Sequence, residues 1–190
     1  MFIKDRIQTS IDTKKRLLDD AKIVGVAEDI TKVITESYKV GNKTLWCGNG
    51  GSSADAQHLA AELSGRYYFD REPLSSEALH VNTSYLTAVA NDYSYDVVYS
   101  RLIKAIGKKG DVLVGLSTSG NSKNVILALE EAKKIGMITV GFTGEKSSKM
   151  DSLCDYLIKV PSSDTPRIQE CHMLLGHSIC EGVEKNLFGE

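Results

Sequence analysis

The stretch that most constrains the fold is residues 111–117, Asp-Val-Leu-Val-Gly-Leu-Ser, whose apolar run is nearly continuous. A strand with one face in water alternates apolar and polar residues, whereas a continuous run is typical of a parallel strand covered on both faces. This run leads directly into a turn at 118–122, and an amphipathic helical pattern then extends to about residue 135, where Gly136 ends it. The stretch therefore predicts a strand, a turn and a helix of a layered α/β protein.

The rest of the chain repeats this alternation of strand and helix. We expect four further strands, at residues 44–47, 78–81, 138–143 and 155–160. Helical patterns separate or follow them, at residues 52–65, 83–91, 95–106 and 165–188. Right-handed β-α-β crossovers between such elements build a three-layer α/β/α sandwich with a five-stranded parallel sheet.

Two amphipathic helical patterns, at residues 3–22 and 26–40, precede the first strand. They form a helical arm over about residues 1–41, which suits packing on the sheet or contact with another subunit. A chain of 190 residues is long enough for one domain with a full core, so we assign residues 1–190 to a single domain.

Composition and charge exclude several classes of protein. A hydrophobic content of 42% and a charged content of 25% are ordinary for a soluble globular protein. A net charge of −2 gives no electrostatic reason to expect nucleic acid or an anionic membrane as a partner. No apolar run approaches the length of a membrane span and no secretory segment opens the chain, so we expect a cytoplasmic protein. No C-x-x-C pair is present, and we expect reduced thiols, mostly in the core, at Cys47, Cys154, Cys171 and Cys180.

A glycine-rich turn follows the predicted strand at 44–47 and opens the helix at 52–65. Glycines let the backbone turn tightly and approach a ligand closely, and Ser52 or Ser53 can cap the helix. An anion at that helix start would meet free N–H groups and the positive end of the helix dipole. The turn lacks the lysine of a nucleotide-binding P-loop and the Gly-x-Gly-x-x-Gly pattern. An ordinary tight turn before an amphipathic helix is the alternative interpretation.

The turn after the strand at 111–117 is rich in hydroxyl groups and has no lysine. Hydroxyls and backbone N–H groups bind a phosphate monoester without a metal, and a simple helix cap would explain one hydroxyl rather than four. The four hydroxyls belong to Ser117, Thr118, Ser119 and Ser122. Both turns fall at carboxyl ends of predicted strands, where ligands bind in sheets of this kind. We therefore predict that this turn binds phosphate.

Polar side chains that can bind a metal recur at helical spacing on two helices that lie far apart in the sequence. His58 and Glu62 are four residues apart and share one face of the helix at 52–65. Gln169 and His177 lie roughly on one side of the final helix, two turns apart. If the two helices pack together, these four side chains would suit a divalent metal, although glutamine is an uncommon zinc ligand. The other histidines, His80 and His172, are expected to be hydrogen-bonded core residues.

Four motifs in order resemble the bacterial phosphoheptose isomerases, which are sugar isomerase (SIS) domain proteins. They are Cys-Gly-Asn-Gly-Gly-Ser-Ser-Ala-Asp-Ala-Gln-His-Leu-Ala-Ala-Glu-Leu-Ser-Gly-Arg at 47–66, Ala-Asn-Asp at 90–92, Gly-Leu-Ser-Thr-Ser-Gly-Asn-Ser at 115–122 and Arg-Ile-Gln-Glu-Cys-His at 167–172. The resemblance covers nearly the whole chain. It implies a flavodoxin-like fold with five parallel strands, and a homotetramer with sites at subunit interfaces.

The resemblance also implies roles for individual residues. Glu62 and His177 match the acid/base pair, and we expect the imidazole to come from the final helix of a neighbouring copy. The residues that match zinc ligands are His58, Glu62, Gln169 and His177. Those that match the substrate site are Asn49, Gly50, Gly51, Ser52, Glu62, Arg66, Asn91, Asp92, Ser117, Thr118, Ser119, Ser122 and Gln169. One departure is Pro166, where some members have an aspartate, so any role of that acid is lost here or taken over by another group.

The implied reaction is an aldose–ketose isomerisation through an enediol. It converts sedoheptulose 7-phosphate to D-glycero-D-manno-heptose 7-phosphate, the first step towards ADP- or GDP-heptose precursors. Proton transfer between neighbouring carbons needs a base on one carbon and an acid on the adjacent oxygen, which a carboxylate and an imidazole can supply. Two alternatives stay open: a non-catalytic SIS adaptor of the replication-initiator-associating type, and a SIS isomerase of another sugar phosphate.

Overall fold

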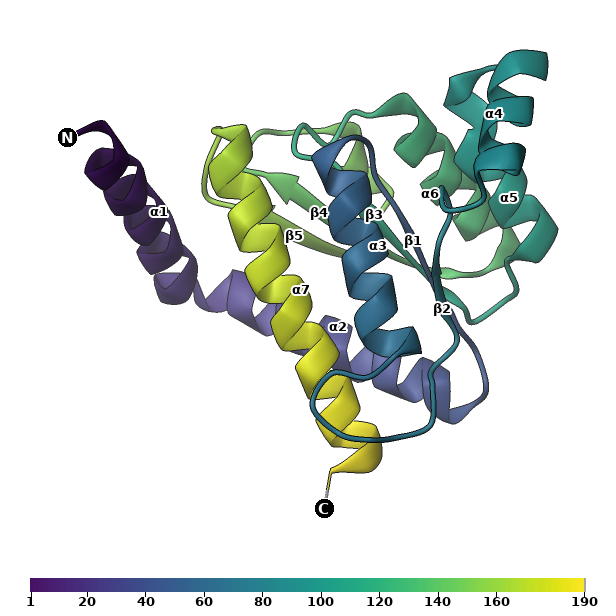
Figure 1. Cartoon of the computed structure of the whole chain (residues 1–190), viewed down its shortest axis with the longest axis horizontal. Coiled ribbons are helices and arrows are strands. Elements are labelled where there is room, and N and C mark those ends of the chain that lie inside the picture. Colours follow the sequence, from purple (N-terminus) through teal and green to yellow (C-terminus); the bar gives the residue numbers. More distant parts are fainter. Residues whose placement is uncertain (190) are drawn as a thin grey trace.

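Five parallel strands form one sheet in the order β2-β1-β3-β4-β5 (Figure 1). The computed structural model describes residues 1–189. The strands are β1 (Thr44–Cys47), β2 (Ser76–Ala78), β3 (Val112–Leu116), β4 (Ile138–Gly144) and β5 (Tyr156–Val160). Every residue of β1 and β3 is buried, as the continuous apolar run at 111–117 predicts for a strand covered on both faces.

Helices cover both faces of this sheet and confirm the predicted three-layer α/β/α architecture. Their bounds are α1 (Phe2–Asp19), α2 (Ala21–Lys39), α3 (Gly51–Ser64), α4 (Thr83–Asp92), α5 (Val98–Ile106), α6 (Lys123–Ile135) and α7 (Thr165–Phe188). One core packs α2, α3 and α7 against strand residues such as Trp46 and Val114. The other packs α4, α5 and α6 against alternate strand residues such as Leu45 and Leu113. Successive side chains of a strand point to opposite faces, so one strand serves both cores.

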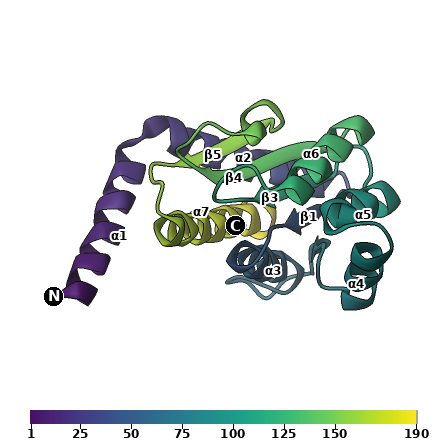
Figure 2. The ribbon, with the colours of Figure 1, turned by 90° about the horizontal axis from the view of Figure 1, so that it is seen from above.

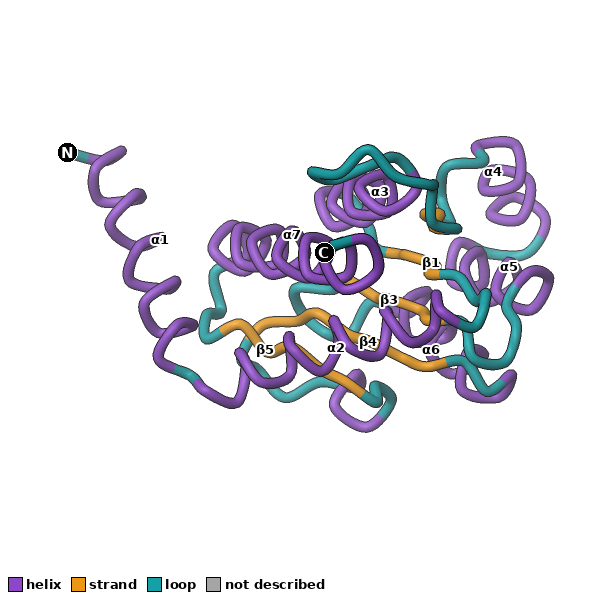
Figure 3. Tube along the Cα trace, turned by 90° about the horizontal axis from the view of Figure 1, so that it is seen from below, coloured by secondary structure: helices purple, strands orange, loops and turns teal. Residues whose placement is uncertain are grey.

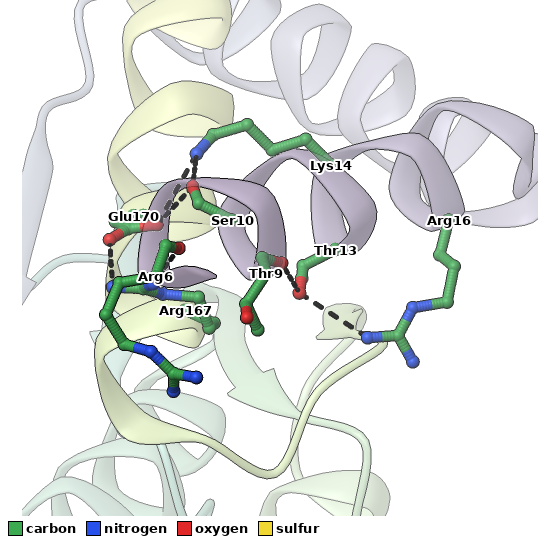
Figure 4. A network of polar contacts seen from close by, with 8 residues as sticks. All are labelled: Arg6, Thr9, Ser10, Thr13, Lys14, Arg16, Arg167 and Glu170. Carbon is green, nitrogen blue, oxygen red and sulfur yellow. Dashed lines mark hydrogen bonds and ion pairs between the residues drawn. The ribbon is translucent and has the colours of Figure 1, made fainter. Parts of the chain in front are cut away.

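The helical arm begins with α1, which extends away from the sheet and its covering helices (Figures 2 and 3). Its apolar side chains Phe2, Ile3 and Ile7 are exposed. A polar network ties the middle of α1 to the start of α7 (Figure 4). In it, Ser10 Oγ donates to Glu170 Oε2 at 2.6 Å and Arg167 Nη1 donates to the backbone carbonyl of Arg6 at 2.7 Å.

Element boundaries differ from the sequence-based ones where side chains cap the backbone. The break between the arm helices falls at Asp20, whose carboxylate accepts the N–H groups of Lys22 and Ile23, so α2 begins before the predicted residue 26. The predicted strand at 78–81 is wrong in position, because the chain turns after Ala78 and Asn82 caps α4. His80 therefore lies in a turn, only partly buried, and among residues 1–189 its Nδ1 has no hydrogen-bond partner. The expectation that His80 is a hydrogen-bonded core residue is wrong. A 3-10 turn at Tyr95–Val97 precedes α5, and a second at Lys149–Ser152 has no counterpart in the sequence pattern.

All four thiols are free, with Cys47, Cys171 and Cys180 buried and Cys154 partly exposed, as expected for reduced core residues. Across residues 1–189, no helix has both the length and the apolar character that crossing a membrane requires.

Candidate active site

Helices α3 and α7 run side by side in the same direction along one face of the sheet (Figure 1). Gly51 at the start of α3 lies against the amide of Gln169, at the start of α7. Further along, Gly176 faces Leu59 so closely that a Cβ atom on Gly176 would overlap the leucine side chain. A glycine at this position therefore permits the close helix approach, and side chains on the two facing surfaces meet.

Three polar side chains converge along this contact between α3 and α7. His58 Nε2 lies 3.0 Å from His177 Nε2 and 3.0 Å from Glu62 Oε1. Ligand atoms of the three residues all lie within 4.8 Å of one another. His58 is half exposed, whereas Glu62 and His177 are partly buried. A carboxylate and two imidazoles in mutual reach, open to solvent on one side, can exchange protons with a small bound molecule.

The hydroxyl-rich turn between β3 and α6 gathers its side chains at the carboxyl end of the sheet. Ser117 Oγ lies 2.9 Å from Ser122 Oγ and 3.4 Å from Ser119 Oγ. Gly120 takes a positive φ of 64°, which lets the chain fold back over these hydroxyls. A cavity of about 230 Å³ opens beside Thr118 and Ser119, and loops at 144–147 and 162–165 complete its wall.

The glycine-rich turn between β1 and α3 is tied to the opposite helix layer. Asn49 and Asn124 exchange amide hydrogen bonds of 2.8 and 2.9 Å, and the Tyr95 hydroxyl donates to Asn49 Oδ1 at 3.2 Å. Gly50 adopts φ 55°, and Ser52 is buried within the first turn of α3. Both predicted ligand turns are therefore linked to each other through the start of α6.

Comparisons with known proteins agree over nearly the full chain. The SIS domain family matches residues 19–144. A phosphoheptose isomerase of Aneurinibacillus thermoaerophilus is 51% identical over 98% of this chain and 94% of its own length. One from Clostridium acetobutylicum is 48% identical over 100% of this chain and 96% of its own length. The solved phosphoheptose isomerase of Neisseria gonorrhoeae superposes with a TM-score of 0.90 at 39% identity, covering 96% of this chain and 97% of that one. The chain belongs to the phosphoheptose isomerase family of SIS domain proteins.

The donor set of the cluster fits a zinc ion, the metal that the resemblance implies. Zinc bonds of about 2.0–2.2 Å in tetrahedral geometry place ligand atoms roughly 3.3–3.5 Å apart. The 3.0 Å separations of His58 Nε2 from His177 Nε2 and Glu62 Oε1 are close to that spacing. Two imidazole nitrogens and one carboxylate oxygen are ligand types that zinc prefers. Gln169 lies two turns before His177 on α7, with its amide beside Gly51.

One expectation drawn from the phosphoheptose isomerase resemblance is wrong. We expected the imidazole beside Glu62 to come from the final helix of a neighbouring copy. In the structure His177 reaches the cluster from the same chain as His58 and Glu62. The physical reason is that α3 and α7 cover the same sheet face, where Leu59 packs directly onto Gly176.

Two of the residues that the resemblance assigns to the substrate lie on α4, away from the helices that carry the cluster. Asn91 and Asp92 are the last residues of α4, a helix that lies on the far side of α3 from α7 (Figures 1 and 3). Asn91 Nδ2 donates to Asp92 Oδ1 at 2.9 Å. Arg66 is exposed in the segment after α3. All three side chains are accessible to solvent in this chain.

Sequence reasoning missed Asp55, which lies three residues before His58 on α3. Among residues 1–189 its Oδ2 is buried with no hydrogen-bond partner. Burial raises the pKa of Asp55, and the nearby His58 acts in the opposite direction. Asp55 lines a cavity of about 550 Å³ together with Lys14, Pro166 and Gln169. The helical spacing of Asp55 and His58 was the available signal for this residue.

Proposed function

We propose that this chain interconverts sedoheptulose 7-phosphate and D-glycero-D-manno-heptose 7-phosphate as an aldose–ketose isomerase. Support comes from relatives named phosphoheptose isomerase that align along nearly the whole chain. The observation that carries the chemistry is the cluster of His58, Glu62 and His177, with ligand atoms within 4.8 Å of one another. The product would enter the synthesis of nucleotide-activated heptose.

Glu62 and His177 divide the proton transfers between them in this proposal. Glu62 removes the proton from one carbon and returns it to the next, and His177 moves protons on the adjacent oxygens. Their proximity lets both groups reach the two-carbon unit that passes through the enediol. His58, within 3.0 Å of both partners, orients them.

The same side chains would hold a zinc ion. We propose His58, Glu62, Gln169 and His177 as its ligands; when bound, zinc would polarise the carbonyl and stabilise negative charge on the oxygens. Glu62 and His177 cannot ligate a metal tightly and transfer protons at the same moment. We therefore propose either that their coordination of the metal is labile or that turnover does not need the metal.

The phosphate end of the substrate is assigned to the turn at 117–122. Hydroxyls from this turn and the free N–H groups at the start of α6 offer donors to a phosphate monoester. The hydroxyls are those of Ser117, Thr118, Ser119 and Ser122. We propose that the rest of the sugar phosphate contacts Asn49, Gly50, Gly51, Ser52, Arg66, Asn91, Asp92 and Gln169.

We propose that the whole chain acts as one SIS domain within a homotetramer, in which exposed apolar residues of α1 such as Phe2, Ile3 and Ile7 are covered. Burying such an apolar face is the main favourable term in subunit association. A cytoplasmic location stays a prediction from the sequence.

The Glu62→Gln variant tests the catalytic proposal. With sedoheptulose 7-phosphate as substrate, we expect its turnover to fall by about 10²- to 10⁴-fold, because the amide cannot accept a proton. The circular dichroism spectrum should stay that of the native protein. Glu181→Gln is the matched control, since Glu181 is a carboxylate of α7 that pairs with Lys185 at 2.7 Å. Unchanged turnover in Glu62→Gln would refute the assignment, and absence of turnover in the native protein would favour the adaptor or another sugar phosphate.

A further inference from the structure

A buried ion pair joins the segment after α3 to the last turns of α7. Arg71 Nε donates to Glu184 Oε1 at 2.8 Å, and the side chains are only 2% and 1% exposed. Burying two charges is costly unless their remaining hydrogen-bonding capacity is satisfied. Both partners of this pair meet that condition, through backbone groups near the active-site cluster.

Glu184 accepts hydrogen bonds from the backbone of the segment that follows α3. Its carboxylate accepts N–H groups from Tyr67, Tyr68 and Phe69 at 2.9, 2.6 and 3.0 Å. Burial would raise the pKa of Glu184, but these three donors and Arg71 outweigh it and hold the pKa below its usual range. The carboxylate is therefore charged at neutral pH, and it fixes the path of residues 67–69.

Arg71 in turn caps the end of α3. Its guanidinium donates to the backbone carbonyls of Glu62 and Leu63, each at 3.0 Å, and of Gly65 at 3.2 Å. Carbonyls in the last turn of a helix have no partner within the helix, so a side-chain donor satisfies them. One of the residues held in this way is Glu62 itself.

The ion pair therefore connects both helices of the active-site cluster. Glu184 follows His177 by two turns on α7, and Arg71 holds the turn of α3 that carries Glu62. The segment that Glu184 fixes also places the ring of Tyr67 6.1 Å from that of His177. Any shift at the pair would move these groups relative to one another.

We propose that Arg71 and Glu184 are positioning residues that set the Glu62 carboxylate in register with His177. The inference rests on the proton-transfer roles proposed for Glu62 and His177. Misplacing a catalytic group by about 1 Å can cost roughly 10²-fold in rate. A rigid link that holds the backbone carbonyl of Glu62 and begins two turns after His177 therefore has kinetic consequences.

A second buried ion pair provides a matched control. Lys43 Nζ lies 2.5 Å from Asp111 Oδ2, and Asp111 is 1% exposed. Asp111 also accepts the backbone N–H groups of Lys43 and Lys108, at 3.1 and 2.8 Å. This pair joins the starts of β1 and β3, and among residues 1–189 its hydrogen bonds involve no residue of α3 or α7.

The experiment compares Glu184→Gln with Asp111→Asn in the full-length protein. Both variants should unfold at lower urea concentration than the native protein. At a temperature where both are folded, kcat for sedoheptulose 7-phosphate should fall roughly 10- to 100-fold in Glu184→Gln, with KM within about threefold. Asp111→Asn should keep kcat within about twofold. Imidazole signals of His58 and His177 in ¹H–¹⁵N spectra should shift only in Glu184→Gln.

Three results would overturn the positioning role. These are a native kcat in folded Glu184→Gln, an equal loss of kcat in Asp111→Asn, or histidine signals that move in neither variant. If Glu184→Gln does not fold, Arg71→Lys keeps the charge but loses the forked donors, and the same comparison applies to it. Glu62→Gln in the same assay separates the two proposals. If Glu62→Gln is active, the catalytic assignment is wrong. If Glu62→Gln is inactive and Glu184→Gln is fully active, only the positioning role is wrong.

Discussion

Helix α7 carries two histidines with opposite surroundings. His172 is fully buried against the sheet, where its Nε2 lies 3.3 Å from the carbonyl of Thr143 and its ring meets Phe142 edge-on. His177 is partly exposed on the side facing α3, within 3.0 Å of His58. One helix thus has a buried structural face and a partly exposed face to which we assign the proposed chemistry. His172 is buried and bonded to a fixed backbone carbonyl, which is typical of a structural residue. His177 is open to solvent and has titratable neighbours, which is typical of a residue that takes part in chemistry.

His172, on the side of α7 that faces the sheet, should make the stability of the protein depend on pH. Burial lowers the pKa of His172 to about 4 from its ordinary 6.5. Below pH 6.5 a proton therefore binds His172 in the unfolded chain more readily than in the folded one. The stability that the neutral His172 contributes is fully present above pH 6.5 and is lost as the pH falls towards 4. Between pH 7 and pH 5 the free energy of unfolding should drop by about 2 kcal/mol from this group.

Urea denaturation at the two pH values measures this drop. The His172→Gln variant has no group that titrates there, so its stability should change less between pH 7 and pH 5. An identical pH dependence in both proteins would contradict the assignment of His172 as a buried neutral residue.

The side of α7 that faces α3 should couple stability to activity. In Gly176→Ala the new Cβ would overlap Leu59, so the helices must separate; overpacking of this kind costs about 1–3 kcal/mol. The separation should also draw His177 away from His58 and lower kcat. Gly182→Ala is the control, because its Cβ would lie 2.7 Å from Thr31 of α2 instead. Both variants should lose stability, but only Gly176→Ala should lose kcat, and equal kcat losses would remove the distinction between the two faces.

The side of α7 that faces α1 should show the smallest effect. Ser10→Ala removes the 2.6 Å bond to Glu170, while Lys14 keeps its 3.5 Å ion pair with the same carboxylate. One partly exposed hydrogen bond contributes about 1 kcal/mol or less, and thermal unfolding should register that loss with kcat unchanged. A fall in kcat in Ser10→Ala would mean that the contact between α1 and α7 also affects catalysis.

Much of the architecture was predictable because local signals were strong. The continuous apolar run at 111–117 specified a doubly covered strand, and the glycine- and serine-rich turns marked the carboxyl edge of the sheet. The second strand was misplaced because β2 is a short edge strand with polar residues at Ser76 and Glu77. Such strands carry little hydrophobic pattern.

The site was predictable only in part, since its contacts join distant segments. Helical spacing paired His58 with Glu62, and Gln169 with His177. Their meeting within one chain depends on Gly176 packing against Leu59, a contact that no local pattern encodes. The pairing of Arg71 with Glu184 could not be predicted for the same reason. The two residues are 113 positions apart in the sequence, and most of their hydrogen-bond partners are backbone groups.

The most direct test of the account is isomerisation in D₂O, with the aldose product examined by NMR. If Glu62 moves a proton through an enediol at a solvent-accessible cluster, the product of the native protein should carry deuterium at carbon 2, and Glu62→Gln should form almost none of it. Native product without deuterium would mean that Glu62 returns the proton before it exchanges with solvent. Labelled product made by Glu62→Gln at the native rate would contradict the central claim.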